Sequence, residues 1–498
     1  MSRSRRAGAL CLALVAFVGT GDLVAQEATS ASAPPMTLTE AIRAEAAAPL
    51  IQPAAPDRCN GCPPRRVGHA FLQNVIVNAF YETANLVRGQ ETAKITPKTW
   101  WANMKQGWVW DLDDFTVNQI GHPYQGNNYF NTGRANGLSF WESAGLTAFG
   151  SATWEYFGET NHASLNDLIN TTLGGIALGE MFHRMAWVVR DTRATGRGRL
   201  MKEIAAAAID PVTGVNRFLS DDSSRVSAKP AEMVPAVLTG LASAGVLWQG
   251  SQASAFTATG DPFLEMDLLY GDLRQGRSRV PYDAFAVRLR FGGGNSFSEA
   301  RVRGRLLGQP VKGERFQFDV LQDYDFNQNQ AYKFGAQSFE VNAAFTGRVS
   351  SRLSVSLAGW GGLTALGAVD SLPLGVTEPP PDVPAEGESP GQGVSVGPRY
   401  YDYGPGSIFG GGVTVTRDGR VFAILMYEGH HLYTLDGVRA NHLLRQARLD
   451  LLAPIHGPLG LGVSGEYFDR RTFYQDAAKT EKRFHFPQIR AYLTWRIP

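Results

Sequence analysis

The run QIRAYLTWRI, residues 488–497, decides the fold of the second half of this 498-residue chain. Its apolar residues recur at every second position: Ile489, Ala491, Leu493, Trp495 and Ile497. Polar or amphipathic residues, Arg490 among them, stand between them. Because successive side chains of a strand point to opposite faces, the run predicts a strand with one apolar and one polar face.

The same period of two extends back to about residue 233 and predicts an antiparallel barrel of about twelve strands. The expected strands cover residues 234–248, 262–270, 283–292, 297–307, 315–326, 334–346, 352–366, 403–416, 420–428, 440–452, 459–469 and 484–497. The first two have the weakest pattern, and residues 233–248 are also compatible with a helix.

Two features favour a transmembrane barrel over a soluble sandwich, which alternates in the same way. The polar faces carry charges of both signs, which suits a wet or ion-paired lumen. Short turns at 347–351, 417–419 and 453–458 alternate with longer connections at 370–397, 429–439 and 470–483. Since outer-membrane barrels have short periplasmic turns and long external loops, an even strand number places both barrel ends on the periplasmic side.

The expected location is therefore the outer membrane of a Gram-negative bacterium, with the N-terminal domain in the periplasm. Its expected partners are outer-membrane lipid and, during biogenesis, the barrel-assembly machinery. A formal net charge of +1 provides no basic field for nucleic acid.

The polar face of the barrel includes one sector rich in arginine. Its members are Arg288, Arg290, Arg301, Arg303 and Arg305. Acidic residues on adjacent strands can pair with them and fill the lumen, because side chains nearly fill a small barrel. An anion-selective path is the alternative.

The N-terminal region shows export signals before any folded domain. Residues 1–25 have the pattern of a secretory signal peptide, with arginines before an uncharged apolar run at 7–19. Residues 26–66 are rich in Ala and Pro and predict a linker. Cys59 and Cys62, in CNGCPP, are expected to form a small disulfide in an oxidising compartment; a redox centre and half a zinc site are the alternatives.

Residues 67–232 predict a helical domain, so the fold class is α+β, with helices first and the barrel at 233–498. The expected helices include 135–157, 165–189 and 200–209, the second of them capped by Ser164 with Asp167 in its first turn. Gly174, Gly175 and Gly179 favour close helix packing within this domain over a transmembrane dimer motif. We expect the domain to pack at the inner mouth of the barrel, or partly in it.

The stretch 108–184 contains most of the chain's chemical groups. His122, Glu155 and Glu159 are the candidate acid/base residues. The wider set of candidate binding residues is Asp111, Asp113, Tyr124, Gln125, Arg134, Glu142, Trp154, Asp167, Asn170 and Glu180.

Each of these candidates also has a structural interpretation. The acids at 111–114 can hold a divalent cation or form the first turn of a helix. The carboxylates can instead form a buried polar network with Arg134 and Arg184 as counter-charges. Because neither a calcium-loop pattern nor the paired Glu-x-x-His of di-iron bundles occurs, no metal ion and no cofactor is predicted.

Three motifs resemble the bacterial domain-of-unknown-function 3943 family. They are WDLDDFTVNQIGHPYQG, WEYFGE and SLNDLINTTLGG, within residues 99–217. The resemblance implies an exported, envelope-associated protein and supplies no activity or catalytic residues. We therefore expect an outer-membrane barrel protein with a role in envelope structure or in handling a lipid or small solute. The alternatives are an envelope hydrolase acting on lipid or glycan, and a passive channel.

Overall fold

The fold is taken from a computed structural model that describes residues 62–250, 256, 260–273, 276–311, 315–370, 401–475 and 481–497. The predicted signal peptide, all but the end of the predicted linker, and Cys59 with its predicted disulfide lie outside these residues. So does nearly all of the predicted long connection 370–397.

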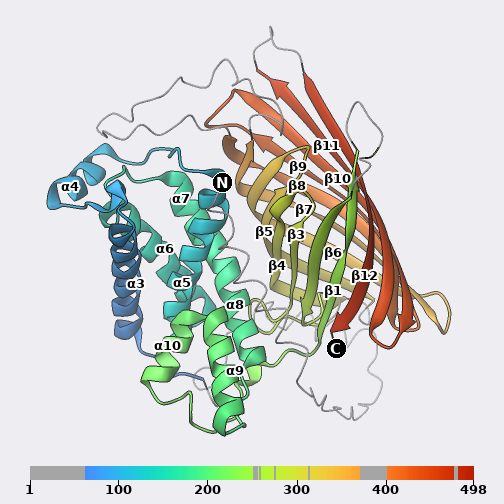
Figure 1. Cartoon of the computed structure of the whole chain (residues 1–498), viewed down its shortest axis with the longest axis horizontal. Helices are drawn as coiled ribbons and strands as arrows, with labels where there is room; N and C mark the ends of the chain where they lie inside the picture. The colour runs from blue at the N-terminus through green and yellow to red at the C-terminus, as the bar shows by residue number, and fades with distance from the viewer. Residues whose placement is uncertain are drawn as a thin grey trace, which may run out of the picture.

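The first part of the chain is helical, as predicted. Its elements are α3 (Val67–Val87), η1 (Glu91–Ala93), α4 (Pro97–Gln106), η2 (Val117–Gly121), α5 (His122–Ala135), α6 (Phe140–Phe157), α7 (Leu165–Ile169), η3 (Asn170–Gly174), α8 (Gly175–Val189), α9 (Gly196–Ile209), α10 (Pro211–Leu219) and η4 (Ala231–Met233). The segments η2 and η3 are π-helical turns inside longer helices. Figure 1 shows this domain as a bundle beside the barrel.

Local sequence explains where the helices start and stop. Ser139 and Glu142 form a capping box at the start of α6, and Ser164 accepts a hydrogen bond from the Asp167 N–H, as predicted, at the start of α7. The predicted single helix over 135–157 was wrong at its start, because Gly137 adopts a φ of 72° and separates α5 from α6.

The second part is a closed barrel of twelve antiparallel strands, which confirms the predicted fold. The strands are β1 (Leu238–Gln249), β2 (Asp261–Tyr270), β3 (Phe285–Gly292), β4 (Asn295–Val311), β5 (Phe316–Gln328), β6 (Lys333–Arg348), β7 (Leu353–Asp370), β8 (Tyr401–Arg417), β9 (Arg420–Tyr433), β10 (Ala440–His456), β11 (Leu459–Tyr474) and β12 (Lys482–Ile497). Each strand pairs with its sequence neighbours, and β1 closes the barrel on β12. Residues 238–249 therefore form a strand, and the helical alternative for this segment was wrong.

The barrel wall has an apolar outside and a polar inside. On β12, Ile489, Leu493 and Trp495 are exposed, whereas Arg490 and Thr494 are buried in the lumen. Large exposed apolar side chains occur in the same alternation on β5 to β11. Such an outer wall is typical of a barrel that has lipid as its solvent.

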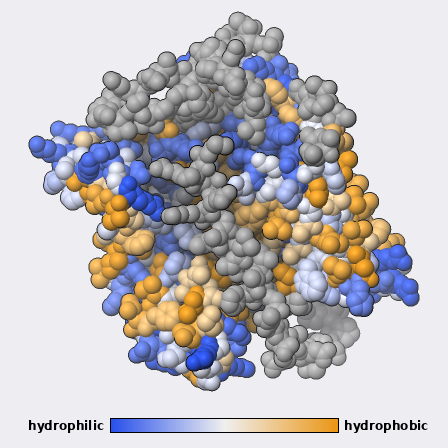
Figure 2. Space-filling model, in the orientation of Figure 1, coloured by the Kyte–Doolittle hydropathy of each residue, from blue (hydrophilic) through white to orange (hydrophobic). Residues whose placement is uncertain are grey.

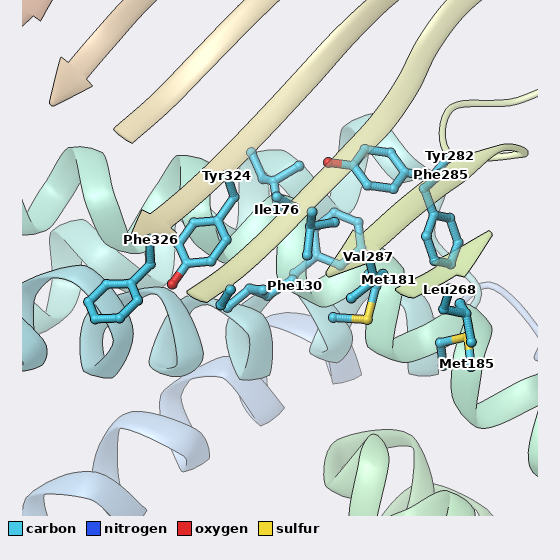
Figure 3. Packing of buried hydrophobic residues seen from close by; sticks show 14 of the residues in the cluster. Phe130, Ile176, Met181, Met185, Leu268, Tyr282, Phe285, Val287, Tyr324 and Phe326 are labelled. Atoms are coloured by element: carbon cyan, nitrogen blue, oxygen red, sulfur yellow. The ribbon is translucent and has the colours of Figure 1, made fainter. Parts of the chain in front are cut away.

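The helical domain lies against the outer wall of the barrel, so the expected position at the inner mouth was wrong (Figure 1). Helix α8 contacts β4 and β5, and η3 contacts β6. Figure 3 shows Ile176 and Met181 of α8 among Phe285 and Val287 of β3 and Tyr324 of β5, all buried in one cluster. The outward residues of this sector are large and apolar, and the helices bury them.

The bundle permits this arrangement because two of its helices cross at glycines. A Cβ on Gly175 of α8 would lie 2.5 Å from the carbonyl carbon of Gly126 on α5. A Cβ on Gly126 would in turn lie 2.8 Å from the Cα of Gly175. Close helix packing within the domain, as predicted for Gly175, is thus what the structure shows.

The outer helices of the bundle are polar toward its interior and apolar toward the outside. On α3, Asn74 is fully buried, whereas Phe71, Val75 and Phe80 are 43%, 52% and 67% exposed. Helix α6 repeats the pattern, with Ser143, Thr147 and Ser151 inside and Trp141 and Phe149 outside. In Figure 2, apolar patches therefore occur on the helical side as well as on the barrel wall. No helix in the described part of the chain combines the length and the apolar character needed to cross a bilayer.

Candidate functional site

The candidate site is a group of acidic residues around His122, which we call the acidic cluster. Its carboxylates are Asp111, Asp113, Glu155, Glu159 and Asp167. They come from the segment before η2, from the end of α6 and the residues just after it, and from the first turn of α7, and His122 is the first residue of α5. The sequence predicted these residues as candidates from two separate stretches, and the fold brings them together.

A short backbone pairing holds two parts of the cluster side by side. The Val109 N–H donates to the Ala163 carbonyl at 2.9 Å, and the Leu165 N–H donates to the Val109 carbonyl at 2.8 Å. This parallel bridge aligns the residues after Val109 with the residues after Ser164. As a result, the Asp111 N–H donates to the Asn166 side chain at 3.0 Å.

Amide side chains connect the carboxylates. Asp111 Oδ1 accepts from Nδ2 of Asn118 and from Nδ2 of Asn166, each at 2.9 Å. Asn166 Nδ2 also lies 2.9 Å from Asp167 Oδ1. The Ser164 N–H donates to Glu155 Oε2 at 2.7 Å. These donors fix the orientation of the carboxylates and bring no positive charge.

His122 is 8% exposed and faces the carboxylates. Its Nε2 lies 3.6 Å from Asp167 Oδ1. A ring nitrogen of His122 and one oxygen each of Asp111 and Asp113 all lie within 4.8 Å of one another. A histidine and several carboxylates are thus within reach of one small ligand.

The electrostatics of the cluster are those of several carboxylates buried close to one another. Burial, followed by the charge of Asp111, raises the pKa of Asp113 to about 7. Burial raises the pKa of Glu155 to about 8, and burial together with the neighbouring carboxylates raises the pKa of Glu159 and Asp167 above the ordinary range. Burial lowers the pKa of His122 and keeps its imidazole neutral.

Two tyrosines of the barrel wall border the cluster. The Tyr401 hydroxyl donates to the Asp113 carbonyl and accepts from Asn118 Nδ2, both at 2.6 Å. The Tyr403 hydroxyl accepts from Asn166 Nδ2 at 3.3 Å. The barrel therefore forms one wall of the site.

Arg134 and Arg184 are the counter-charges of Glu180, one of the carboxylates of the predicted polar network. Arg134 Nε lies 2.9 Å from Glu180 Oε2, and Arg184 Nε donates to Glu180 Oε1 at 2.8 Å. Because the charge of Glu180 is matched by these two arginines, the coulombic attraction outweighs burial and lowers its pKa. The single polar network considered in the sequence analysis is thus divided, and the described arginines do not reach Glu155 or Glu159.

The other candidate binding residues are distributed around the domain. Tyr124 packs on Phe182, and Gln125 donates to the Tyr129 hydroxyl. Glu142 belongs to the exposed capping box of α6 and pairs with Arg65. Trp154 packs on Tyr81, and the buried amide of Asn170 has no hydrogen-bond partner among the described residues.

The predicted lumen arginines point into the barrel and form ion pairs there. Arg290 on β3 bonds Glu265 on β2 at 2.7 Å and Glu466 on β11 at 3.1 Å. Arg301 and Arg303 on β4 both bond Glu428 on β9, and Arg288 and Arg305 pair with Asp267 and Asp283. Since β3 and β11, and likewise β4 and β9, are not neighbours, these ion pairs cross the lumen.

The barrel interior contains a cavity at one level and packed apolar side chains at another. A cavity of about 510 Å³ lies on the side of the short turns and is lined by residues such as Ser243, Asp267 and Arg288. A buried apolar group that includes Tyr332, Phe334 and Phe468 occupies another level of the interior.

Sequence reasoning missed four residues that build the site: Asn118, Asn166, Tyr401 and Tyr403. The two asparagines stand inside the quoted motifs, so the motifs themselves are the signal that could have identified them. The two tyrosines follow the site by more than two hundred residues, and only the lateral packing of the domain brings them near.

Comparison with known proteins finds a family model that matches part of the chain and solved barrel structures that are similar to it. Residues 107–212 match DUF3943, a domain of unknown function, which confirms the resemblance carried by the three motifs. None of the curated proteins is similar in sequence to the chain.

Among solved structures, the chain is similar to the NanC porin (8% identity, TM-score 0.27) and the KdgM porin (8% identity, TM-score 0.23), with 51% of this chain covering 98% of each. It is also similar to the outer membrane phospholipase A of Escherichia coli, at 12% identity and a TM-score of 0.23, with 52% of this chain covering 93% of that protein.

Proposed function

From a helical domain that matches DUF3943 over residues 107–212 and a barrel with an apolar outer wall, we propose that this chain is an outer-membrane protein that handles a lipid. In this proposal the helical domain lies beside the barrel at the level of the bilayer. Its outer face contacts acyl chains, and its acidic cluster receives the polar part of the lipid.

The observation that carries the proposal is the apolar outer face of α3. Phe71, Leu72, Val75, Ile76 and Phe80 are each between 43% and 67% exposed on its outer face. Covering five half-exposed side chains of this size contributes on the order of 4–8 kcal/mol, taking about half of ~1.5–3 kcal/mol for each. In a domain surrounded by water these side chains would stay exposed, whereas acyl chains would cover them.

The buried side of the same helix supports the same conclusion. Asn74 Nδ2 lies 3.1 Å from the Leu146 carbonyl and 3.3 Å from the Thr132 hydroxyl. Asn78 Nδ2 donates to the Thr153 hydroxyl at 2.9 Å. The side-chain N–H groups of Asn74 and Asn78 thus have partners inside the bundle while the apolar groups of α3 face outward, an arrangement that suits a lipid-facing bundle.

The position of the acidic cluster suits a lipid that approaches from the side. Asp111 and Asp113 are partly exposed, whereas Glu155 and Asp167 behind them are buried. The cluster also contacts the barrel wall through Tyr401. A polar group can therefore enter from the surface while its apolar chains stay along the outer wall.

Hydrolysis of the lipid is the second candidate function. The observation that favours it is the 3.6 Å separation between His122 Nε2 and the Asp167 carboxylate, which are suitable partners for activating a water molecule. Mass spectrometry of lipids incubated with the folded protein tests this directly. Product formed by the wild type and absent with His122→Ala would establish it.

A passive channel has less support, because ion pairs such as Arg301 with Glu428 cross the lumen. Each such pair is buried, and breaking one costs ~3–5 kcal/mol. A path for solutes would require several of them to separate.

The test of the proposed location uses depth-dependent quenching in lipid vesicles. A fluorophore is attached to the full chain at Val75→Cys on α3, and quenching by lipids that carry a nitroxide on the acyl chain is measured. Leu493→Cys on the outer wall of β12 is the positive control, and Ser220→Cys, in the exposed turn after α10, is the negative control. The chain without added cysteine provides the labelling blank.

We expect Val75→Cys to be quenched as strongly as Leu493→Cys. Quenching at the level of Ser220→Cys would place the helical domain in the periplasm, as first predicted, and would contradict the proposal. The measurement is made in the presence of EDTA, so that it does not depend on bound metal.

A further inference from the structure

We infer that the acidic cluster binds one divalent transition-metal cation, with His122, Asp111 and Asp113 as its ligands. The inference deepens the proposed lipid-handling role, from which its biological purpose follows, while its chemistry stands on the cluster alone. A bound cation in this place would be available to the phosphate or another anionic oxygen of a lipid.

The distances are those of a site that a small cation can draw together. One oxygen each of Asp111 and Asp113 and a ring nitrogen of His122 lie within 4.8 Å of one another. Two ligands that each coordinate one ion at ~2.0–2.2 Å are separated by roughly 3–4 Å, so only small side-chain rotations are needed. Asp167 stands behind His122, with its Oδ1 at 3.6 Å from Nε2.

Buried polar atoms that lack partners point to the same ligand. The Nδ1 of His122 has no hydrogen-bond partner among the described residues, although the side chain is only 9% exposed. The same holds for Oε1 of Glu155, which is 1% exposed. Leaving such a group unsatisfied costs ~1–3 kcal/mol, and more for a charged group, which a cation would offset.

Three buried carboxylates of the cluster differ in charge compensation from Glu180 of the same domain. Within the described part of the chain, no lysine or arginine forms an ion pair with Glu155, Glu159 or Asp167. Glu180, in the same domain, has two arginines. A buried carboxylate is stabilised by a paired cation, by a metal ion or by protonation, and a metal ion would supply here the positive charge that the arginines supply to Glu180.

A second group of one histidine and two carboxylates lies in the barrel lumen and serves as an internal comparison. Asp325, Glu428 and His430 also place their ligand atoms within 4.8 Å. There, however, Arg301 Nη1 donates to Glu428 Oε1 at 2.6 Å. The positive charge that a metal would bring is already supplied by a side chain.

The ligand types indicate which metals fit. An imidazole nitrogen together with carboxylate oxygens suits Zn²⁺ or Mn²⁺, whereas Ca²⁺ and Mg²⁺ prefer all-oxygen sites. The partly exposed Asp111 and Asp113 leave one side of the cluster accessible from the surface. This side would leave a coordination position for an outside oxygen.

The experiment uses the full chain, folded in detergent, stripped with EDTA and free of lipid. Retained Zn²⁺ and Mn²⁺ are measured after dialysis for the wild type and for His122→Ala, Asp113→Asn and His430→Ala. The last variant is the matched control, since it removes the histidine of the lumen group. Cold gel mobility, compared with boiled samples, and circular dichroism establish that each variant is folded.

We expect one equivalent of metal in the wild type and in His430→Ala, and a fall in affinity of at least ~10–100-fold in the other two variants. Pulsed electron paramagnetic resonance of Mn²⁺ in the wild type should show coupling to one histidine nitrogen, a result that does not depend on any variant folding. No retained metal, no nitrogen coupling, equal retention by all four proteins, or a loss confined to His430→Ala would each overturn the inference. Because the quenching test is made in EDTA and this one without lipid, either proposal can fail alone.

Discussion

Replacing Gly175 by alanine should separate two helices that support the site. A Cβ at this position would lie 2.5 Å from both the Cα and the carbonyl carbon of Gly126. Ordinary van der Waals contact begins at 3.4 Å, so α5 and α8 must move apart by about 0.9 Å (3.4 − 2.5) or distort locally. Neither obstructing atom belongs to a flexible side chain that could turn away.

The expected loss of stability depends on whether the new Cβ meets backbone or side-chain atoms. Overpacking a close-packed interior costs ~1–3 kcal/mol, and a backbone obstacle belongs in the upper half of that range. For a domain of roughly 150 residues, ~2–3 kcal/mol corresponds to a fall in Tm of about 4–12 °C. The matched control is Gly145→Ala on α6, where a Cβ would meet nothing within 4 Å. That substitution should leave Tm unchanged or raise it slightly, since alanine favours helix by up to ~1 kcal/mol.

The assay is thermal unfolding of the full chain in detergent, followed by circular dichroism at a helix-sensitive wavelength and at one fixed scan rate. The barrel provides an internal reference, because gel mobility reports its unfolding separately. Equal Tm values for Gly175→Ala and Gly145→Ala would refute the reasoning that α5 and α8 are in backbone contact.

Three further perturbations probe other parts of the molecule. Tyr401→Phe removes a hydroxyl with two hydrogen bonds to the helical domain and should lower the free energy of unfolding of that domain by ~1–3 kcal/mol, measured by urea titration. Burial lowers the pKa of His183 below its ordinary value of 6.5, so as pH falls the histidine is protonated in the unfolded chain before it is protonated in the folded one. The free energy of unfolding should therefore fall as pH drops below 6.5. Thermal melts at several pH values should show a weaker pH dependence of Tm for His183→Gln. Arg490→Met removes a fully buried guanidinium bonded to Glu265 and Glu466 and should destabilise the barrel by ~3–5 kcal/mol, measured as the urea midpoint of the gel-mobility shift.

Each of these has an outcome that would contradict it. Tyr433→Phe, at a hydroxyl on the exposed outer wall, is the control for Tyr401→Phe, and equal effects would mean that the domain is not anchored there. An unchanged pH profile in His183→Gln would show that this histidine does not titrate between the folded and unfolded states. A barrel as stable with methionine as with Arg490 would show that the charged layer is not closed by this residue.

The fold was predictable because its second half depends on a local signal. Apolar and polar residues alternate along each strand, as Ile489 and Leu493 do with Arg490, and this alternation does not depend on how the strands are arranged around the barrel axis. The π-helical turns at 117–121 and 170–174 were not predictable in the same way, since single π-helical turns inside α-helices have no periodic signal in the sequence.

The place of the helical domain could not be read from the sequence, because one apolar strand face has two possible partners. The outward residues of β3, Phe285 and Val287, have the same pattern as those of β12. Nothing in the pattern shows that helices cover the first pair and not the second. Sequence reasoning consequently identified the acids of the cluster and missed Tyr401, which reaches it only through this packing.

The lateral seating of the helices on the barrel also fixes an order of events in biogenesis. The surface that receives α8 is made by strands that follow it in the chain, so the helices are synthesised before the strands that they contact. During that interval Met181 and Ile176, which finally contact the wall, face water or a holding factor. The packing of the helical domain is therefore completed only after β4 and β5 have formed.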